Sequence, residues 1–264
     1  MSLHDLLKDK IPHEKLSLLP RGFEIIGDIA IITIPPALDD EKYLIADALT
    51  NQRKDIKTVL RKLHKIEGAA RAGEFELLLG NSTTTIHREN NCAFFVDITK
   101  TYFSGKLYYE RNRIAQKVND GEAVLVLFAG VGPFLISIKK KKNVKITGLD
   151  NNPAACAFLK KNIELNDIEA HVILADANSM EHIFKEPFDR IVMPTPYGQD
   201  HFLNLASSIL KPEGIIHFYT FKKDFEIAHF KKLLLESGWH IDFYRGCGEI
   251  APRAKRYVFD LRKN

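Results

Sequence analysis

From Glu122 to the end of the chain, apolar runs alternate with segments of helical periodicity. The apolar runs predict strands at residues 124–128, 144–149, 171–174, 190–193 and 214–219. The periodic segments predict helices at residues 133–140, 153–165, 201–210 and 223–237. Because strand and helix alternate, this half of the chain is predicted to be an α/β domain with a doubly wound, mainly parallel, Rossmann-like sheet.

Two more strands are expected near the C-terminus, around residues 239–244 and 257–261. A stretch with Gly246, Gly248 and Pro252 separates them and is predicted to be a loop, so the two strands should form a terminal antiparallel pair. Residues 121–264 are therefore expected to form one domain around this sheet.

The first hundred residues show shorter strand signals. β-Branched residues on both sides of Gly27-Asp28 predict a hairpin over residues 23–34, and residues 39–50 have helical spacing. Residues 64–73 are polar and predicted to be a loop. Further short strands are expected at residues 57–60, 76–79, 83–89 and 93–97. Residues 1–100 are thus predicted to form a smaller α+β domain, built mainly of hairpins.

Residues 101–120 are expected to link the two domains through a helix that begins near Ser104 or Gly105. Its apolar face carries Leu107 and Ile114, whereas Glu110, Arg111 and Arg113 are expected on or near its polar side.

The strand predicted at residues 124–128 runs into a turn that contains Gly130 and Gly132. Glycine lacks a Cβ, so the backbone can turn tightly there and approach a ligand closely. Two glycines are equally typical of a plain strand-to-helix turn, and Asp150 alone is equally typical of a solvated acid at a strand end. Together with Asp176, which follows the third strand, they predict a nucleotide-like cofactor.

The pattern differs from a dinucleotide fingerprint, because Leu135 stands where the third glycine of Gly-x-Gly-x-x-Gly is expected. It favours S-adenosylmethionine, with Asp150 on the ribose hydroxyls and Asp176 on the adenine amino group. The neighbouring residues Phe128, Asn151 and Ala177 are assigned to the same cofactor site.

Composition limits the class of protein further. The chain has 264 residues, of which 45% are hydrophobic and 27% charged, as is usual for globular proteins. No apolar run approaches the roughly 20 residues that cross a bilayer, and the N-terminus lacks the apolar core of a signal peptide. We therefore expect a cytoplasmic protein without a membrane interaction.

The three cysteines are far apart and form no Cys-x-x-Cys pair, so neither a disulfide framework nor a metal site is expected. His87 and His217 fall on predicted strands and are expected to be packed or hydrogen-bonded. The net charge of +4 permits an RNA partner without requiring one. We expect a monomer.

Several segments carry a resemblance to a known family. Residues 128–134, Phe-Ala-Gly-Val-Gly-Pro-Phe, follow Tyr102-Phe103-Ser104 and Glu110-Arg111-Asn112-Arg113. This combination resembles the archaeal and eukaryotic tRNA guanine N1-methyltransferases, which act just 3′ of the anticodon. It also resembles their wyosine-pathway relatives, which transfer an aminocarboxypropyl group from the same cofactor. Residues 84–90 and 162–166 match as well, and the similarity runs from about Phe23 to the C-terminus.

The resemblance implies a class I S-adenosylmethionine-dependent enzyme that modifies the anticodon region of tRNA. The chain looks too short to include the extra N-terminal tRNA-elbow domain of the full-length methyltransferases, and without it a weaker grip on tRNA is expected.

The resemblance also assigns roles to individual residues. Glu110 matches the acid that takes the guanine N1 proton; without the family, it would be interpreted as an exposed helix acid paired with Arg111 or Arg113. Arg71 matches the arginine that stabilises charge on the guanine O6, and its alternative is a loop cation near phosphate or water. Tyr102 matches an aromatic residue beside the methyl and carboxypropyl end of the cofactor, with a core tyrosine as the alternative.

Two positions depart from the family pattern. Val126 stands where the family has a strand acid, and Pro194-Thr195-Pro196 replaces Asn-Leu-Pro. Pro194 adjoins the cofactor edge but has neither a side-chain amide nor a backbone N–H for the target base. Thr195, Tyr197 or Gln199 could take over that contact.

Three hypotheses therefore remain open: guanine N1 methylation, aminocarboxypropyl transfer to a wyosine precursor, and a catalytically degenerate homologue that binds RNA or a protein partner.

Overall fold

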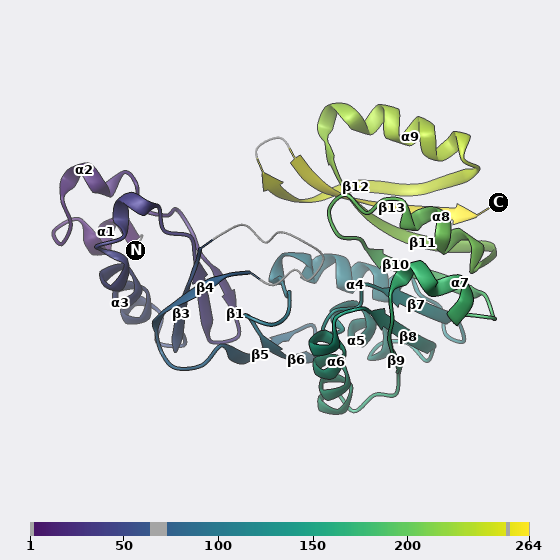
Figure 1. The fold of residues 1–264 in the computed structure, drawn as a ribbon, viewed down its shortest axis with the longest axis horizontal. Helices are drawn as coiled ribbons and strands as arrows, with labels where there is room; N and C mark the ends of the chain where they lie inside the picture. The colour runs from purple at the N-terminus through teal and green to yellow at the C-terminus, as the bar shows by residue number, and fades with distance from the viewer. Residues whose placement is uncertain (1–2, 64–72, 252–253, 264) are drawn as a thin grey trace. The chain divides into compact units, whose positions relative to one another are not determined.

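The computed structural model describes residues 3–63, 73–251 and 254–263 (Figure 1). The chain divides into two compact units. The first comprises Met1–Arg88 and Ala93–Gly105, and the second comprises Glu89–Cys92 and Lys106–Asn264. Among the described residues, no helix is both long and apolar enough to cross a membrane.

The first unit is built on a four-stranded sheet of order β1-β2-β3-β4. Its strands are β1 (Glu24–Ile26), β2 (Ile29–Ile32), β3 (Thr58–Lys62) and β4 (Phe75–Leu79). Helices α1 (Leu3–Leu7), α2 (His13–Leu16) and α3 (Lys42–Gln52) complete it, with a 3-10 turn at Pro36–Leu38. Their apolar side chains form one core that includes Leu7, Ile45, Leu49 and Val59.

One strand pair of this unit is not antiparallel. β1 and β2 form the expected hairpin at Gly27-Asp28, but β2 and β3 are parallel. A parallel pair needs a crossover, and α3, together with the turn before it, supplies that crossover. The predicted loop at residues 64–73 falls almost wholly outside the described residues.

A separate two-stranded sheet follows, formed by β5 (Thr84–Glu89) and β6 (Cys92–Asp97). The turn residues Asn90 and Asn91 both have positive φ, 47° and 60°. Two left-handed residues match the right-handed twist of the strands on either side, and asparagine tolerates this conformation better than most residues.

The second unit contains a seven-stranded sheet of order β12-β13-β11-β10-β7-β8-β9. Five strands are mutually parallel: β7 (Ala123–Leu127), β8 (Lys145–Asp150), β9 (His171–Leu174), β10 (Phe188–Pro194) and β11 (Leu210–Lys223). β13 (Ala254–Lys263) pairs antiparallel with β11 and with β12 (Trp239–Ala251). The predicted doubly wound α/β sheet with a terminal antiparallel pair is thereby confirmed.

One detail of that terminal pair differs from the prediction. Gly246 and Gly248 lie within β12 and not in a loop. The register against β13 shifts between Gly246 and Glu249, and Gly248 has a φ of 144°. A glycine inside a strand often marks such an irregularity.

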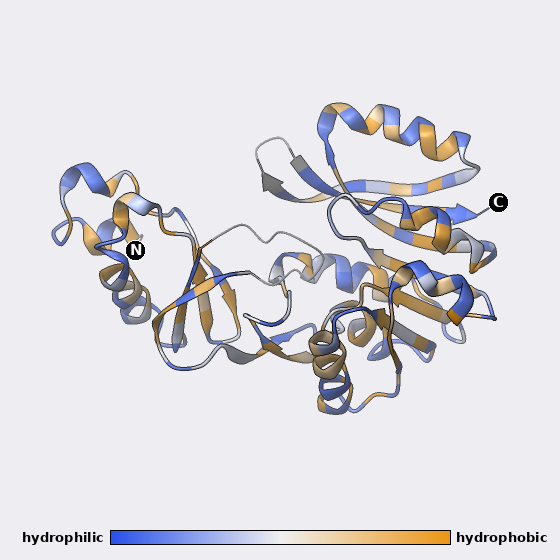
Figure 2. Cartoon of the chain, viewed as in Figure 1, coloured by the Kyte–Doolittle hydropathy of each residue, from blue (hydrophilic) through white to orange (hydrophobic). Residues whose placement is uncertain are grey.

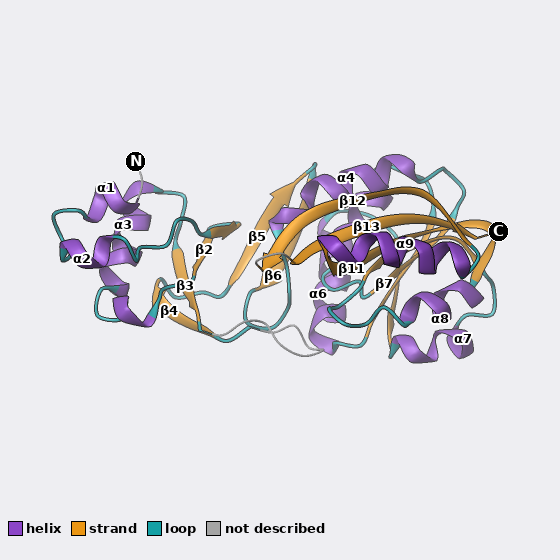
Figure 3. Cartoon of the chain, turned by 90° about the horizontal axis from the view of Figure 1, so that it is seen from above, coloured by secondary structure: helices purple, strands orange, loops and turns teal. Residues whose placement is uncertain are grey.

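Helices cover both faces of the seven-stranded sheet (Figures 1 and 3). α4 (Tyr108–Lys117), α5 (Pro133–Lys139) and α6 (Pro153–Leu165) lie on one face, and a 3-10 turn at Gly105–Leu107 precedes α4. α7 (Met180–Ile183), α8 (Phe202–Ser208) and α9 (Ile227–Glu236) lie on the other. Further 3-10 turns stand at Ala177–Ser179 and Asp224–Glu226.

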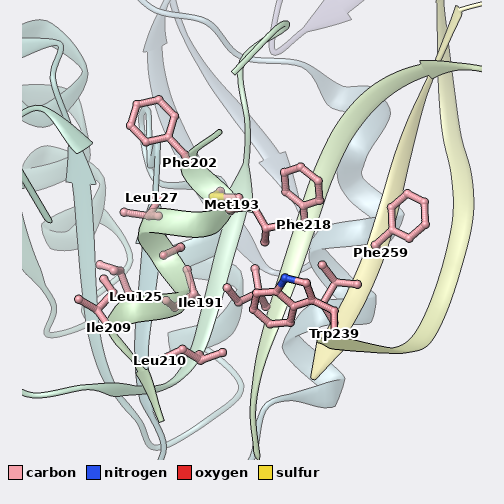
Figure 4. Packing of buried hydrophobic residues seen from close by; sticks show 14 of the residues in the cluster. Leu125, Leu127, Ile191, Met193, Phe202, Ile209, Leu210, Phe218, Trp239 and Phe259 are labelled. Atoms are coloured by element: carbon pink, nitrogen blue, oxygen red, sulfur yellow. The ribbon is translucent and has the colours of Figure 1, made fainter. Parts of the chain in front are cut away.

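The two faces of the central strands differ in chemistry. Figure 2 shows the central strands around β7 and β10 as largely hydrophobic. On the face of α7 to α9, residues such as Leu125, Met193, Phe218 and Phe259 pack into one apolar cluster (Figure 4). The face of α4 also carries buried polar residues, His217 and Asp260 among them. These buried polar residues belong to the hydrogen-bond network of the candidate site.

Candidate active site

The strand order reverses between β7 and β10. From β7 the chain proceeds outward to β8 and β9, and it then returns to β10 and β11 on the other side. Ligands of open α/β sheets bind outside the carboxyl ends of the strands at such a switch point. Phe128 and the glycine turn lie at the end of β7, and Pro194 ends the neighbouring strand β10.

The backbone after β7 is held in an unusual conformation. Phe128, Gly130 and Gly132 have positive φ values of 52°, 56° and 91°. The φ of Gly132 favours glycine, and an added Cβ would also come within 2.2 Å of Leu159 Cδ1 and displace that side chain. Phe128 is not a glycine, and a left-handed conformation at such a residue often marks a functional turn. Its ring packs edge-on against Phe202, at 5.1 Å between centroids.

Side chains from other elements fix this turn. Gly130 N donates to Asp150 Oδ2 at 2.7 Å, and Asn152 N donates to Asp150 Oδ1 at 2.9 Å. The buried side chain of Asn162 on α6 donates to Val131 O at 3.0 Å. The interpretation of the sequence gave Asn162 no role at this turn, although the segment around it contributed to the family resemblance.

The carboxylate of Asp150 retains capacity for a ligand. An ionised carboxylate offers about four lone-pair positions, and the two backbone amides use two of them. Asp150 is half-buried at the end of β8. This arrangement suits the acceptance of two ribose hydroxyls.

The remaining cofactor candidates lie on adjacent strand ends. Asn151 and Asp176 are exposed, and Ala177 is buried at the start of a 3-10 turn. Asp176 Oδ1 accepts from Asn178 N at 2.8 Å and from Asn178 Nδ2 at 2.9 Å. Asp176 Oδ2 accepts no hydrogen bond from the part of the chain that the structure describes, which leaves it able to contact an adenine amino group.

Two residues assigned from the family stay predictions. Arg71 lies outside the described residues. Tyr102 is half-buried and belongs to the first unit, whereas the glycine turn belongs to the second.

Glu110 corrects an expectation drawn from the helix pattern. It was expected on or near the polar side of its helix, yet its residue is only 2% exposed. Arg111 is equally buried and pairs with Glu89. Glu110 and Arg111 therefore pack on protein, whereas Gln116 and Lys117 of the same helix are exposed.

The Glu110 carboxylate accepts three hydrogen bonds. Arg113 Nε and Tyr219 Oη each donate to Oε2 at 3.0 Å, and Arg245 Nη2 donates to Oε1. Tyr219 is the register partner of Pro194, and its ring packs against Phe134 at 5.3 Å between centroids. Because Phe134 follows the glycine turn directly, Glu110 lies beside the proposed cofactor edge.

The hydrogen bonds continue from Glu110 along the sheet. Arg113 binds Asp260 through two bonds of 2.7 and 3.1 Å, and Asp260 in turn lies 2.7 Å from His217 Nδ1. Burial alone raises the pKa of Asp260, but His217 and Arg113 outweigh it and hold that pKa well below its usual range. Burial lowers the pKa of Arg113, and Asp260 reverses this, so the guanidinium stays charged.

The network fixes the protonation state of His217. Arg190 Nη1 lies 2.8 Å from His217 Nε2, and a guanidinium can only donate. Nε2 must therefore accept, and Nδ1 carries the proton towards Asp260. Arg190 ends the series with two bonds to Glu122, of 2.6 and 2.9 Å. Burial lowers the pKa of His217, which agrees with a neutral ring. The prediction that this histidine is hydrogen-bonded is confirmed.

This network predicts a loss of stability in mild acid. A neutral buried His217 binds no extra proton when folded but does so when unfolded below about pH 6.5, so the free energy of unfolding falls as pH drops below that value. Asp260 adds a loss with the same sign at pH values below about 4. Urea titrations between pH 5 and 7.5, followed by the fluorescence of Trp239, measure the first effect.

In that experiment His217→Gln is the matched variant, because it retains hydrogen-bonding groups but cannot titrate. The difference in slope between wild type and variant should approach about 1.4 kcal/mol per pH unit well below pH 6.5. Parallel curves for the two proteins would contradict a neutral His217.

The two departures from the family pattern have different structural consequences. Val126 is buried within β7, between Gly148 and Val192, where an apolar side chain fits. Thr195 is also buried, and its hydroxyl donates to Met193 O at 3.1 Å, so it is poorly placed to contact a base. Tyr197, by contrast, is 77% exposed.

The doubly wound sheet and the glycine turn at its switch point place the chain among α/β proteins that bind a nucleotide-like cofactor. The model of the TRM5/TYW2 methyltransferase domain matches residues 85–236, and the model of the TYW2 N-terminal domain matches residues 3–83. The chain belongs to the TRM5/TYW2 methyltransferase family.

Similar proteins fall into both branches of this family. A tRNA (guanine(37)-N(1))-methyltransferase Trm5b of Pyrococcus abyssi is 38% identical over 89% of this chain and 68% of its own length. A second Trm5b, from Methanocaldococcus jannaschii, is covered over 62% of its length. A tRNA(Phe) (4-demethylwyosine(37)-C(7)) aminocarboxypropyltransferase of Pyrococcus horikoshii is 30% identical over 98% of this chain and 95% of its own.

Solved structures give the same division. The complex of aTrm5 with tRNALeu has a TM-score of 0.88 at 34% identity and covers 100% of this chain and 78% of that one. Pyrococcus horikoshii TYW2 in complex with MeSAdo has a TM-score of 0.80 at 29% identity. That match covers 98% of this chain and 97% of the TYW2 chain. The family resemblance inferred from the sequence is thereby confirmed.

Proposed function

We propose that this chain is an S-adenosylmethionine-dependent tRNA-modifying enzyme that methylates N1 of the guanine 3′ of the anticodon. The observation that carries the proposal is the contact series from the glycine turn to a buried carboxylate: Phe134 packs on Tyr219, and Tyr219 donates to Glu110. The similarity to Trm5b proteins and to the tRNA-bound aTrm5 structure supports the choice of reaction and substrate.

The residues at the switch point fit the cofactor. The glycine turn gives close backbone approach, Asp150 has acceptor capacity for ribose, and Asp176 has an oxygen for adenine. When bound, S-adenosylmethionine supplies an electrophilic methyl group. Asn151, Ala177, Pro194 and Phe128 line the edges of the same site in this proposal.

Glu110 acts as the general base in this proposal. Guanine N1 bears a hydrogen that must leave as the new N–C bond forms, and a carboxylate within hydrogen-bond reach can accept it. Arg71 stabilises the negative charge that develops on O6, and Tyr102 packs beside the reacting end of the cofactor. These two roles rest on the family resemblance.

Three donors occupy three of the about four acceptor positions of the Glu110 carboxylate, so displacement of one donor would widen the access of the target base to it. The Arg245 side chain is 35% exposed, whereas Arg113 is 11% exposed and bound twice to Asp260. The Arg245 Nε is buried and has no hydrogen-bond partner within residues 3–63, 73–251 and 254–263. Arg245 is thus the donor that withdraws when the target base enters.

A second candidate is aminocarboxypropyl transfer to a tricyclic wyosine precursor. Two observations favour it: the N-terminal residues 3–83 match the TYW2 model, and the Pyrococcus horikoshii transferase matches over nearly its full length. Pro194 in place of the family asparagine is compatible with it, because the family resemblance implies that this asparagine bonds the target base and that the aminocarboxypropyl relatives lack it.

Labelled cofactor separates these possibilities. The chain is incubated with S-adenosylmethionine labelled either in the methyl or in the carboxyl group. The RNA is a tRNA transcript with guanine 3′ of the anticodon, or tRNA that carries the tricyclic precursor. Methyl label in the transcript is expected, and a transcript with adenine at that position should stay unlabelled. Carboxyl label in the precursor tRNA would establish the second candidate, and no transfer of either label would leave only a degenerate homologue.

A further inference from the structure

An exposed aromatic residue follows β10 in the segment where the chain departs from the family pattern. Tyr197 lies 77% exposed after Pro194-Thr195-Pro196. One side of its ring contacts Phe221 of β11, at 5.6 Å between centroids and with 50° between ring planes. The rest of the ring faces solvent, so it is free to stack on a ligand.

A cation completes this aromatic pair. The Arg256 guanidinium carbon lies 5.0 Å from the centroid of the Phe221 ring. Phe221 and Arg256 are register partners across β11 and β13, so the sheet itself positions them together. Aromatic rings beside an arginine are the usual composition of surfaces that bind single-stranded nucleic acid, where bases stack on the rings and the cation contacts phosphate.

Phe221 lies close to Tyr219, the hydrogen-bond partner of Glu110, which places this surface next to the proposed position of the target base. Side chains alternate along a strand, so Phe221 shares the sheet face of Tyr219, whose hydroxyl donates to Glu110. Two residues along a strand span about 7 Å, roughly two stacked base layers of 3.4 Å. A nucleotide next to a target base held at Glu110 would therefore reach the Tyr197 and Phe221 rings.

The surrounding charges favour RNA over an apolar protein partner. Arg256 and the exposed Lys223 add positive charge on the sheet face of Phe221. Lys222 and Lys255 alternate onto the other face, where the Lys222 ammonium lies over the Phe230 ring. The Lys223 ammonium lies 5.6 Å from the centroid of the Phe225 ring, so a second aromatic residue with a cation stands at the same edge.

We propose that Tyr197, Phe221 and Arg256 form a platform that stacks the nucleobase adjacent to the modified one. This inference rests on the proposed function, because it takes RNA as the substrate. An enzyme that acts on a base atom turns the target out of the stack and leaves its neighbour without a stacking partner. The platform replaces that lost partner and thereby holds the target base at Glu110.

The test uses an anticodon stem-loop with the fluorescent base 2-aminopurine next to the target guanine, on one side or the other. Stacking quenches the fluorescence of 2-aminopurine. The wild type and Tyr197→Phe are expected to quench that fluorescence when the base stands at one of the two positions, whereas Tyr197→Ala is not. Tyr197→Ala is also expected to weaken RNA binding by about 5- to 150-fold, the usual range for loss of one stacking ring.

The matched control is Tyr244→Ala. Tyr244 is also exposed, stacks on Phe259, and carries the Lys231 ammonium 4.2 Å from its ring centroid. It lies on the opposite sheet face, since its partner Phe259 belongs to the apolar cluster under α7 to α9. Its removal should leave RNA binding and quenching unchanged.

Arg256→Gln gives an independent readout. Loss of one phosphate contact should lower the salt slope of RNA binding by about 1, without changing S-adenosylmethionine binding. If the wild type binds no RNA at all, the proposed function itself fails. If the wild type binds and modifies RNA while Tyr197→Ala binds it equally well, or if neither 2-aminopurine position is quenched, the platform is refuted and the proposed function stands.

Discussion

Replacing Glu110 with glutamine is expected to lower the rate of group transfer by about 100- to 10,000-fold, the range that general base catalysis contributes. Glutamine keeps the shape of the side chain and one acceptor oxygen, but it cannot take the N1 proton. Binding of S-adenosylmethionine should be retained, because Glu110 is not among the residues proposed to hold it. Single-turnover rates with saturating cofactor, together with cofactor affinity by calorimetry, measure both quantities.

The same change also disturbs a buried ion network, so a control must separate stability from chemistry. Glu122→Gln is suited to this, because Glu122 is bound by two hydrogen bonds to Arg190 at the other end of the network. Both variants remove a mostly buried carboxylate from an arginine. Only Glu110→Gln should lose the transfer rate, and equal losses in the two variants would show that Glu110 acts through structure.

The elements around the glycine turn could be predicted because their signals are local. A few neighbouring residues are enough to indicate each feature: the apolar run of β7, the two glycines of the turn and the acid at the end of β8. The structure adds that Asp150 already binds Gly130 N. This acid, which we propose binds the cofactor, thus also shapes the turn, and its position in the sequence does not reveal that second role.

The surroundings of Glu110 could not be predicted in this way. Helical periodicity separates apolar from polar positions, and it takes the polar side to face water. For α4 that assumption fails, because the sheet beneath it presents Tyr219, Arg245 and Asp260. These residues lie more than a hundred positions away in the chain, so nothing near Glu110 in the sequence signals its burial.

The end of β12 also cannot be predicted from local signals. Glycines predict a loop there, but β12 continues through Gly246 and Gly248 with a shifted register. Gly246 pairs with Tyr257 of β13, and Gly248 lies in the irregularity before the pairing resumes at Glu249. Arg245 stands just before this irregularity, where its guanidinium reaches Glu110.

Asp260→Asn is expected to cost about 3–5 kcal/mol of stability, the usual result when one partner of a buried ion pair is removed. Asp260 is 2% exposed and accepts hydrogen bonds from both Arg113 and His217. Asparagine offers a single acceptor oxygen, and its NH2 group would face a guanidinium that can only donate. Urea unfolding of the second unit, followed at Trp239, gives the free energy.

Asp242→Asn is the comparison that isolates burial. Asp242 also binds an arginine through two hydrogen bonds, since Arg262 donates at 2.7 and 3.1 Å, and it lies on the adjacent strand β12. Its side chain and that of Arg262 are 20% and 43% exposed, so water can replace the lost contact. The cost there should stay below about 1 kcal/mol.

The Asp260→Asn and Asp242→Asn substitutions also test how the network acts in catalysis. If Asp260 holds Arg113, and Arg113 holds Glu110, then Asp260→Asn should also lower the transfer rate at temperatures where the variant is fully folded. A stable Asp260→Asn protein with the wild-type rate would show that Arg113 positions Glu110 without help from β13. A large loss at Asp242 would instead mean that charge pairing, and not burial, dominates this sheet.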